Sequence, residues 1–328
     1  EGQGDDTILA YHGSENVSIR MYQDHAALRR LKIDGRVPER IADGTLSRSV
    51  FGVYITNASY CRIEDVTIVG CGYKLASELG EAENHNTLDQ NGQAITIVST
   101  AKDSEQAAGN VIQNVRILDP EGRLSFAIRL YTHFQDGKQY EPAGQAVREN
   151  RIVENTVVGT SKNAIELVGP NTVKNYVAYN TIKDARGYGG IEADFGASDN
   201  TFKGNTVEGY KGHSTQLQAR DQTFIAFQSA GGQSAENRKL TTQRALNNHF
   251  LDNRVTEVRP AFPGQDVKGM FVLNSGCVVV EGFYFQNVEV VGGESVAIDV
   301  ERASDVQVRD SYVYGATYCI VTKDGTRN

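Results

Sequence analysis

The sequence predicts an all-β chain folded as a right-handed parallel β-helix, a single-stranded solenoid of about nine coils. Three observations support this prediction: a unit that repeats every 25 residues, alternation of apolar and polar residues inside each unit, and Gly and Asn between the units. The 328 residues include 33 glycines and only 6 prolines. This balance suits a fold with many tight corners and long ladders of backbone hydrogen bonds.

The repeated unit reads Asn-x-apolar-x-x-Asn-Thr-apolar. It occurs as Asn150-Arg-Ile-Val-Glu-Asn155-Thr-Val, Asn175-Tyr-Val-Ala-Tyr-Asn180-Thr-Ile and Asn200-Thr-Phe-Lys-Gly-Asn205-Thr-Val. Weaker matches begin near residues 26, 61, 110, 248, 278 and 306. The alternation within each unit is that of a strand, and a fixed period of this length is typical of stacked coils. We expect the repeated Asn side chains to form a hydrogen-bonded ladder at a turn, as part of the scaffold.

These matches extend over most of the chain and predict one elongated domain over residues 1–328. The opening Gly2-Gln-Gly4-Asp-Asp-Thr reads as sequence from within a fold, so we expect the chain to be a fragment of a longer one. No 18-residue apolar run is present, which argues against a membrane helix. The net charge of −8 argues against a nucleic-acid partner, which would need a basic surface.

A second strand in most coils begins with a small residue followed by an inward Ile. Aligning these strands places Arg129, Glu166 and Glu192 in one outward-facing row on successive coils. A parallel row contains Tyr131 and Asp194. Carboxylates this close repel one another and raise at least one pKa, which is typical of a functional site.

The lengths of the loops predict a groove over these carboxylates. The coils that carry Glu166 and Glu192 are the shortest, whereas insertions lie near residues 72–92, 132–149 and 219–247. Long loops on a rigid scaffold are usually functional, and aromatic and Arg side chains in them suit a sugar chain. The side chains expected to bind substrate are Arg129, Tyr131, His133, Tyr188, Gln218 and Phe227.

The chemistry that fits is glycoside hydrolysis, which uses one protonated carboxylic acid and one carboxylate. Glu166 and Asp194 lie diagonally across neighbouring strands, and we expect a separation of roughly 8 Å between them. Inverting enzymes hold their two carboxyl groups about 6.5–9.5 Å apart. The hypothesis is therefore an inverting pair of Glu166 and Asp194, with Glu192 tuning the proton affinity and with no metal or cofactor.

Two alternatives remain open. Three carboxylates could instead hold Ca²⁺ for β-elimination, with Arg129 as the base of a polysaccharide lyase. Alternatively, the chain is a non-enzymatic β-helix that binds carbohydrate in adhesion, or a structural shaft.

The stacked Asn units and the outward Glu166, Glu192 and Asp194 resemble the pectate-lyase-like β-helix superfamily, and within it most closely the phage tailspikes and other polysaccharide depolymerases. This resemblance implies an endoglycosidase that acts on a polysaccharide, located extracellularly or on a virion tail. It also implies a homotrimer, in which outward apolar residues such as Val98, Val168 and Phe271 would be buried between subunits.

Overall fold

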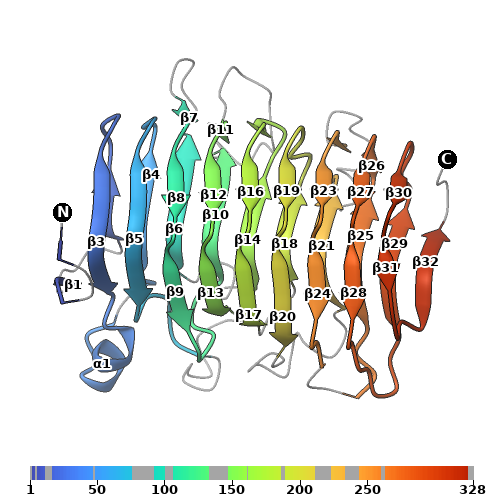
Figure 1. Cartoon of the computed structure of the whole chain (residues 1–328). Coiled ribbons are helices and arrows are strands. Elements are labelled where there is room, and N and C mark those ends of the chain that lie inside the picture. Colours follow the sequence, from blue (N-terminus) through green and yellow to red (C-terminus); the bar gives the residue numbers. More distant parts are fainter. Residues whose placement is uncertain are drawn as a thin grey trace.

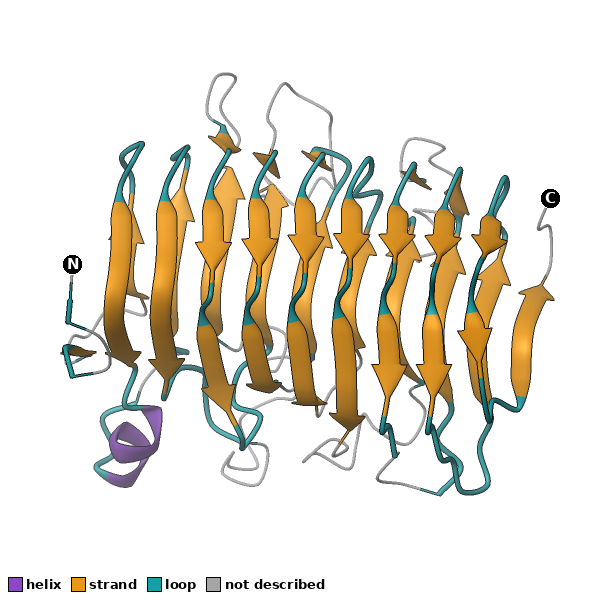
Figure 2. Cartoon of the chain, in the orientation of Figure 1, coloured by secondary structure: helices purple, strands orange, loops and turns teal. Residues whose placement is uncertain are grey.

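The computed structural model describes residues 2–3, 6–11, 17–46, 49–75, 92–99, 106–132, 147–160, 162–185, 189–210, 223–232, 244–259 and 263–323. These residues form a parallel β-helix, as predicted (Figures 1 and 2). The strands of the nearer sheet run downward in Figure 1, those behind run upward, and the chain advances from left to right. This winding is right-handed, as it is in nearly all parallel crossovers.

One face of the solenoid is a sheet of ten parallel strands, one from each coil. Its strands, in spatial order, are β2 (Val17–Met21), β4 (Phe51–Thr56), β6 (Gln93–Ser99), β10 (Phe126–Thr132), β14 (Asn163–Val168), β18 (Gly189–Asp194), β21 (Phe224–Ala230), β25 (Val267–Leu273), β29 (Ser295–Glu301) and β32 (Tyr318–Lys323). The candidate catalytic residues lie on this sheet.

The opposite face is a sheet of seventeen strands, because most coils contribute two short strands to it. It begins with β1 (Ile8–Ala10), β3 (Ala27–Asp34) and β5 (Arg62–Val69). The first short strands are β8 (Val111–Gln113), β12 (Arg151–Val153), β16 (Tyr176–Ala178), β19 (Thr201–Lys203), β23 (His249–Leu251), β27 (Val279–Glu281) and β30 (Gln307–Arg309). The second are β9 (Arg116–Asp119), β13 (Thr156–Gly159), β17 (Thr181–Ala185), β20 (Thr206–Tyr210), β24 (Arg254–Thr256), β28 (Tyr284–Gln286) and β31 (Tyr312–Val313).

Short strands pair at the corner that precedes this face. They are β7 (Ala107–Ala108), β11 (Val147–Arg148) and β15 (Thr172–Val173), and further along β22 (Ala245–Leu246) and β26 (Ser275–Gly276). The described residues include one helix, α1 (Val37–Ala42), at the lower left of Figure 1. No helix in the described part of the chain is long and apolar enough to cross a membrane.

The core is a continuous stack of inward side chains between the two faces. Ile165 and Leu167 on β14 and Ile191 on β18 are fully buried in it, as strand alternation predicted. The rings of Phe202 and Phe250 stack on successive coils with centroids 4.6 Å apart. Each fully buried side chain of this size stabilises the fold by roughly 1.5–3 kcal/mol.

The predicted Asn ladder is confirmed, and it is double. One ladder contains Asn110, Asn150, Asn175, Asn200 and Asn248, and the other contains Asn155, Asn180, Asn205 and Asn253. Asn180 is typical: its amide nitrogen donates to Asn205 Oδ1 and to the carbonyl oxygen of Ile152, both at 2.9 Å. Its Oδ1 accepts from the backbone and side-chain nitrogens of Asn155. Both ladders are buried, so they satisfy backbone groups that water does not reach.

A left-handed residue precedes each Asn of the second ladder and turns the chain. Glu154 has φ 59°, Tyr179 has φ 57° and Asp252 has φ 55°, while Gly204 occupies the same place with φ 62°. This conformation is costly for residues other than Gly, and the ladder's hydrogen bonds offset that cost. Each corner therefore depends on two adjacent residues, the left-handed residue and the Asn that follows it. The repeated sequence motif identifies only the Asn.

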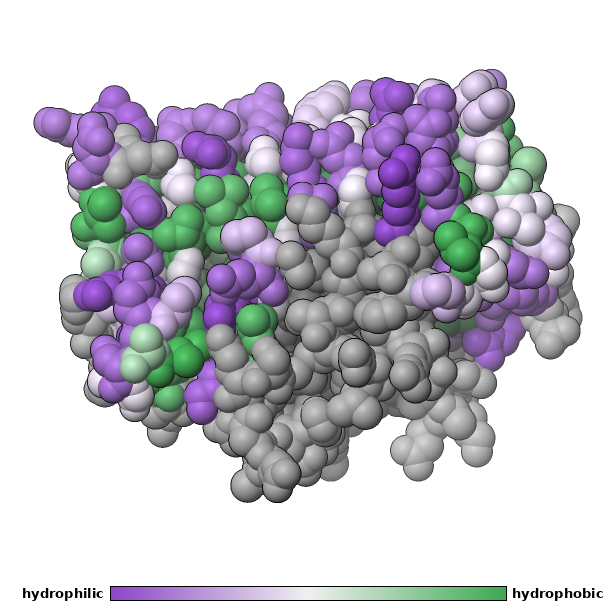
Figure 3. Space-filling model, turned by 90° about the horizontal axis from the view of Figure 1, so that it is seen from below, coloured by the Kyte–Doolittle hydropathy of each residue, from purple (hydrophilic) through white to green (hydrophobic). Residues whose placement is uncertain are grey.

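The described surface is mixed in character when seen from the edge that carries α1. In Figure 3, hydrophilic side chains line one long margin, and hydrophobic ones form patches nearer the two ends of the solenoid. The described part of this edge therefore exposes both hydrophilic and hydrophobic side chains.

Replacing Asn180 with Ala tests the ladder. The change leaves the N–H of Asn155 and the carbonyl of Ile152 without these buried partners, at about 1–3 kcal/mol for each group. We expect the free energy of unfolding to fall by at least about 3 kcal/mol, measured by chemical denaturation. Lys203→Ala, a half-buried change on the neighbouring strand β19, is the control and should cost under about 0.5 kcal/mol. A cost for Asn180→Ala no larger than the control's would contradict the scaffold role.

Candidate active site

Three carboxyl groups from two neighbouring strands form the candidate site. Arg129 pairs in register with Glu166, and Glu166 with Glu192. In the parallel row, Tyr131 pairs with Val168 and Val168 with Asp194. The rows predicted from the sequence are therefore present, because the inward Ile and Leu residues determine which side chains face outward.

The three carboxyl groups lie closer together than predicted. One carboxylate oxygen from each of Glu166, Glu192 and Asp194 lies within 4.8 Å of the others. The expected separation of about 8 Å between Glu166 and Asp194 is therefore wrong. The 8 Å value combined the spacing between strands with the rise per residue along a strand, so it describes backbone positions. The carboxyl oxygens at the ends of the side chains lie closer together than the backbone positions do. The distance argument for an inverting pair is lost with it.

The prediction of an exposed floor is also wrong at these residues. Glu166, Glu192 and Asp194 point away from the core, yet they are only 4%, 5% and 6% exposed. A carboxylate shielded from water must be compensated by hydrogen bonds or by positive charge, or it takes up a proton. The surroundings of each carboxyl group therefore decide its state.

Those surroundings differ among the three groups. Nε of Arg129 lies 2.6 Å from Oε2 of Glu166 and forms an ion pair with it. Nδ2 of Asn163 donates to Oε2 of Glu192 at 2.6 Å and lies 3.5 Å from Oε1 of Glu166. Oδ1 of Asp194 accepts the backbone N–H of Phe195 at 2.8 Å. Arg129 forms its ion pair with Glu166. A negative charge on Glu192 is therefore less well compensated by positive charge than one on Glu166.

The pKa values of two groups follow from these surroundings. Burial raises the pKa of Glu192 well above its usual range, and the nearby charges of Asp194 and Glu166 raise it further. Burial and then the charge of Glu166 raise the pKa of Asp194 to about 7, against the lowering effects of the Phe195 N–H and of Lys162 and Arg129. The site therefore retains protons at neutral pH next to an ion-paired carboxylate.

The residues expected to bind substrate have different outcomes. Arg129 lies over the rings of Phe126 and Tyr131, with its guanidinium carbon 4.3 Å and 5.0 Å from their centroids. The hydroxyl of Tyr131 lies 2.8 Å from that of Tyr54. Both Arg129 and Tyr131 thus lie beside the carboxyl groups. His133, Tyr188 and Gln218 lie outside the described residues.

The prediction for Phe227 is wrong. Its side chain is fully buried in the core, edge-on to Phe250 and Phe283 at 6.5 Å and 6.1 Å. It pairs in register with the inward Ile191, while Gln228 pairs with Glu192 and occupies the outward row. The sequence does contain this signal. In the second strand of each coil a small residue is followed by an inward and then an outward one, and Ala226, Phe227 and Gln228 fit that order.

Sequence reasoning also missed Asn163. Strict alternation from the outward Glu166 would point Asn163 inward. The structure instead turns both Ala164 and Ile165 into the core, which brings Asn163 to the outer side beside Glu192. A local break in the pleat is not visible in a pattern of period two, so no sequence signal identified this residue.

The apolar residues expected to be buried between subunits are already buried within one chain. Val98, Val168 and Phe271 are 0%, 2% and 8% exposed, and Phe271 packs with Ala230 and Leu273. They therefore supply no exposed apolar face, and the basis offered for a trimer interface is wrong.

A second charged cluster on the same sheet provides a contrast. Asp299 is fully buried, and one of its oxygens lies 2.7 Å from Nζ of Lys268 and 3.2 Å from Nζ of Lys323. Lys323 also lies 3.2 Å from Glu301. Two ammonium groups balance two carboxylates here, which is the usual structural arrangement of buried charge. At Glu166, Glu192 and Asp194, three carboxyl groups share two nearby cations among the described residues, Arg129 and Lys162.

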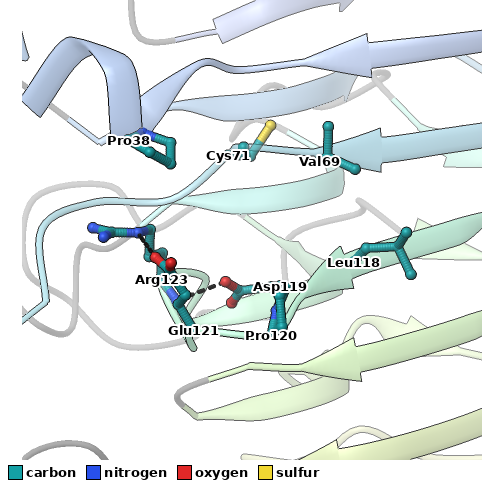
Figure 4. A pocket seen from close by; sticks show the side chains of 9 residues that line it. Pro38, Val69, Cys71, Leu118, Asp119, Pro120, Glu121 and Arg123 are labelled. Atoms are coloured by element: carbon teal, nitrogen blue, oxygen red, sulfur yellow. Dashed lines mark hydrogen bonds and ion pairs between the residues drawn. The ribbon is translucent and has the colours of Figure 1, made fainter.

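A cavity of about 290 Å³ lies beside β9, near the end of the molecule that carries α1 (Figure 4). Its lining includes Cys71, Leu118, Asp119, Glu121 and Arg123. Both carboxylate oxygens of Asp119 accept backbone N–H groups, from Arg123 at 2.8 Å and Leu124 at 2.7 Å, and the Arg123 side chain pairs with Glu121 at 2.6 Å. The polar groups that line this cavity bond to one another within the turn of residues 119–124. The cluster of Glu166, Glu192 and Asp194 is therefore the better candidate for an active site.

The solved structures that resemble this chain at low sequence identity include the following three proteins. A GH87 alpha-1,3-glucanase catalytic domain in complex with nigerose matches with a TM-score of 0.41 and 12% identity, over 98% of this chain and 59% of that one. GH136 lacto-N-biosidase from Eubacterium ramulus matches with a TM-score of 0.34 and 11% identity, over 84% of this chain and 51% of that one. The A-module of the mannuronan C-5 epimerase AlgE6 from Azotobacter vinelandii matches with a TM-score of 0.35 and 12% identity, over 94% of this chain and 90% of that one. This chain thus spans little more than half the length of the first two proteins. No family model and no curated protein matches it.

The pKa values in the site predict a dependence of stability on pH. The unfolded chain releases the proton of Asp194 near pH 3.9, whereas the folded protein holds it to about pH 7. The stabilising effect of the protonated group is therefore complete below about pH 4 and is lost as the pH rises to about 7. Glu192 acts in the same direction.

We expect the unfolding free energy of the wild type to fall by about 2–4 kcal/mol between pH 4.5 and pH 8. Asp194→Asn should flatten this slope, measured by denaturant unfolding at several pH values. Asp310→Asn, an exposed change on the opposite face, is the control. A slope that Asp194→Asn leaves as steep as in the wild type would contradict the raised pKa.

Proposed function

We propose that this chain is a glycoside hydrolase that cleaves a polysaccharide, with Glu192 as the proton donor and Glu166 as the nucleophile. The observation that supports this most strongly is the convergence of buried carboxyl groups in unequal surroundings. Glycoside hydrolysis needs one carboxyl group that carries a proton and one that does not. Burial raises the pKa of Glu192 well above its usual range, whereas Glu166 forms an ion pair with Arg129.

These roles differ from the pairing of Glu166 with Asp194 expected from the sequence. Burial and the neighbouring charges of Asp194 and Glu166 raise the pKa of Glu192 well above its usual range, which suits Glu192 to donate a proton to a leaving oxygen. Asp194, which shares the outer side of β18 with Glu192, takes the tuning role, since its charge raises the pKa of Glu192 further.

The short separation favours retention of the anomeric configuration. Retaining enzymes hold their two carboxyl groups about 5–5.5 Å apart, because one of them attacks the sugar directly. An approach within 4.8 Å between oxygens of Glu166 and Glu192 is consistent with that arrangement and leaves less room for a water between them.

A polysaccharide suits the side chains beside the carboxyl groups. Tyr131, Tyr54 and the Arg129 guanidinium provide ring faces and hydrogen-bond donors, which a sugar with apolar faces and hydroxyl groups can use. Such substrates occur on cell surfaces and in extracellular matrices. An extracellular or virion-tail location and a homotrimer remain proposals, and light scattering in solution tests the trimer directly.

The second candidate function is a Ca²⁺-dependent polysaccharide lyase. Ca²⁺ binds carboxylate oxygens at 2.3–2.6 Å, so ligands on opposite sides of one ion lie about 5 Å apart. The mutual approach of the three carboxylates within 4.8 Å fits such a set, with Arg129 placed next to it. A lyase product carries a new C=C bond, and a hydrolase product does not.

The decisive experiment digests a panel of neutral and acidic polysaccharides, with Ca²⁺ or with EDTA. New reducing ends, their anomeric form and the ultraviolet absorbance of a C=C bond are followed together. We expect reducing ends with the retained anomer, without new absorbance and without sensitivity to EDTA. Absorbance that requires Ca²⁺ would assign the site to the lyase. If the protein binds a polysaccharide but cleaves none of the panel, the result would favour an adhesin.

Matched variants connect the activity to the site. Glu192→Gln and Glu166→Gln should each lower kcat by about 10²–10⁴-fold while the circular dichroism spectrum stays unchanged. Glu208→Gln, which removes a carboxylate paired with Lys183 on the opposite face, is the control and should retain the wild-type rate. Near-normal turnover by either site variant would contradict the assigned roles.

A further inference from the structure

The outward row that contains the carboxyl groups continues along the ten-stranded sheet toward the N-terminal end of the solenoid. Arg20 on β2 pairs in register with Tyr54 on β4. From there the row runs through Thr96 and Arg129 to Glu166. Four strand spacings of about 4.8 Å therefore separate Arg20 from Glu166, or roughly 19 Å along the axis. Arg20 belongs to the same surface as the candidate site but lies far from its carboxyl groups.

This part of the sheet is basic and aromatic. The strands β2, β4, β6 and β10 contain no Asp or Glu, although the chain as a whole has a net charge of −8. Their side chains include Arg20, Tyr54, Arg129 and Tyr131. The lysines at the other end of the sheet are different, because they pair with the buried Asp299. Positive charge on the outer sheet is thus available to an anionic ligand on the β2 side of the carboxyl groups.

Arg20 has no carboxylate partner within the described part of the chain. Its Nη1 donates to the hydroxyl of Tyr22 at 3.3 Å, and its guanidinium carbon lies 6.0 Å from the centroid of the Tyr54 ring. Arg129 in the same row and Arg309 on the opposite face instead form ion pairs with Glu side chains. The guanidinium of Arg20 is exposed, so its planar set of N–H donors can pair with an external anion.

Two tyrosine rings accompany this cation. Tyr22 is 59% exposed, and Tyr54 is half-buried, with its hydroxyl 2.8 Å from that of Tyr131. A ring supports the apolar face of a sugar, while a guanidinium pairs with a carboxylate or sulfate group on it. The combination therefore suits a charged sugar better than a small inorganic anion or a neutral sugar.

We propose that Arg20, Tyr22 and Tyr54 form a subsite that binds an anionic sugar of the substrate, with Arg20 paired with its carboxylate or sulfate group. The inference rests on the proposed function only in assigning this sugar to the substrate, since binding at Arg20 needs no catalysis. The subsite lies roughly 19 Å from Glu166, so the sugar that it binds is several units away from the cleaved bond. The substrate class is therefore an acidic polysaccharide.

Affinity electrophoresis in native gels tests the subsite directly. The gels contain dextran, carboxymethyl dextran or dextran sulfate, which share one backbone and differ in charge. The protein and both charged probes are negative overall, so retardation requires a local cation. We expect the charged probes to retard the wild type, less so as salt is added, and dextran to leave its mobility unchanged. The charged probe with the lower Kd identifies the preferred anion.

Matched variants connect the retardation to Arg20. Arg20→Gln should raise the Kd for the charged probes by about 3–10-fold, whereas Arg20→Lys, which keeps the charge, should retain most of the affinity. Arg151→Gln is the control, because Arg151 is also exposed and lies 4.9 Å from the centroid of a ring, that of Tyr176, on the opposite face. It removes the same charge and should bind as the wild type does.

Three results would overturn the proposal. They are equal weakening by Arg20→Gln and Arg151→Gln, no weakening by Arg20→Gln, and a wild type that neither charged probe retards. Circular dichroism of each variant shows whether the fold is kept. A loss of fold in Arg20→Gln would leave Arg20→Lys and Tyr22→Ala to decide, and the second of these should also weaken binding of the charged probes.

Kinetics give a second readout and keep the two failures separate. On an acidic polymer that the wild type cleaves, Arg20→Gln should raise KM by about 3–10-fold with little change in kcat, because uniform binding is lost. An activated aryl monoglycoside is too short to reach Arg20 and should show a much smaller loss. Equal losses on both substrates would contradict a remote subsite. If the wild type cleaves no polymer but Arg20 still governs retardation, the proposed function fails and the subsite stands.

Discussion

The register between neighbouring coils is the constraint on which the rest of the structure depends. Each buried Asn of the two ladders bonds to the Asn of the next coil and to a backbone carbonyl, so a coil cannot slip without breaking several buried hydrogen bonds at once. A slip by one residue would also turn Ile165 outward and Glu166 into the core. The carboxyl groups therefore meet because the ladders and the apolar stack hold two minimal coils in one alignment.

The electrostatics of the outer sheet suggest that the carboxyl cluster is retained for chemistry. Buried like charges cost free energy, and the protein could have balanced them, as it does around Asp299 with Lys268 and Lys323. At the carboxyl cluster it places Arg129 against Glu166, with Lys162 nearby, and the pKa values of Glu192 and Asp194 are still raised. Buried carboxyl groups whose pKa values are raised by burial and by one another are the arrangement expected of an active site.

The fold could be predicted from the sequence because its determinants are local and periodic. The Asn units at 150, 175 and 200 and the inward Ile of each second strand located the strands and the outward row of Arg129, Glu166 and Glu192. The distances within the site could not be predicted, since they depend on how far side chains lean above the sheet. Asn163 was missed because Ala164 and Ile165 both turn inward, and Phe227 was misassigned because its strand was not aligned on Ala226.

The central claim is that Glu166 attacks the sugar while Glu192 supplies and recovers the proton. The most direct test incubates Glu192→Gln with an activated glycoside of the sugar that the wild type cleaves, followed by mass spectrometry of the intact and digested protein. A good leaving group needs no acid, and without the base the intermediate should accumulate. The account predicts one glycosyl unit attached to the peptide that contains Glu166. A labelled Asp194, or turnover at the wild-type rate with no attached sugar, would contradict it.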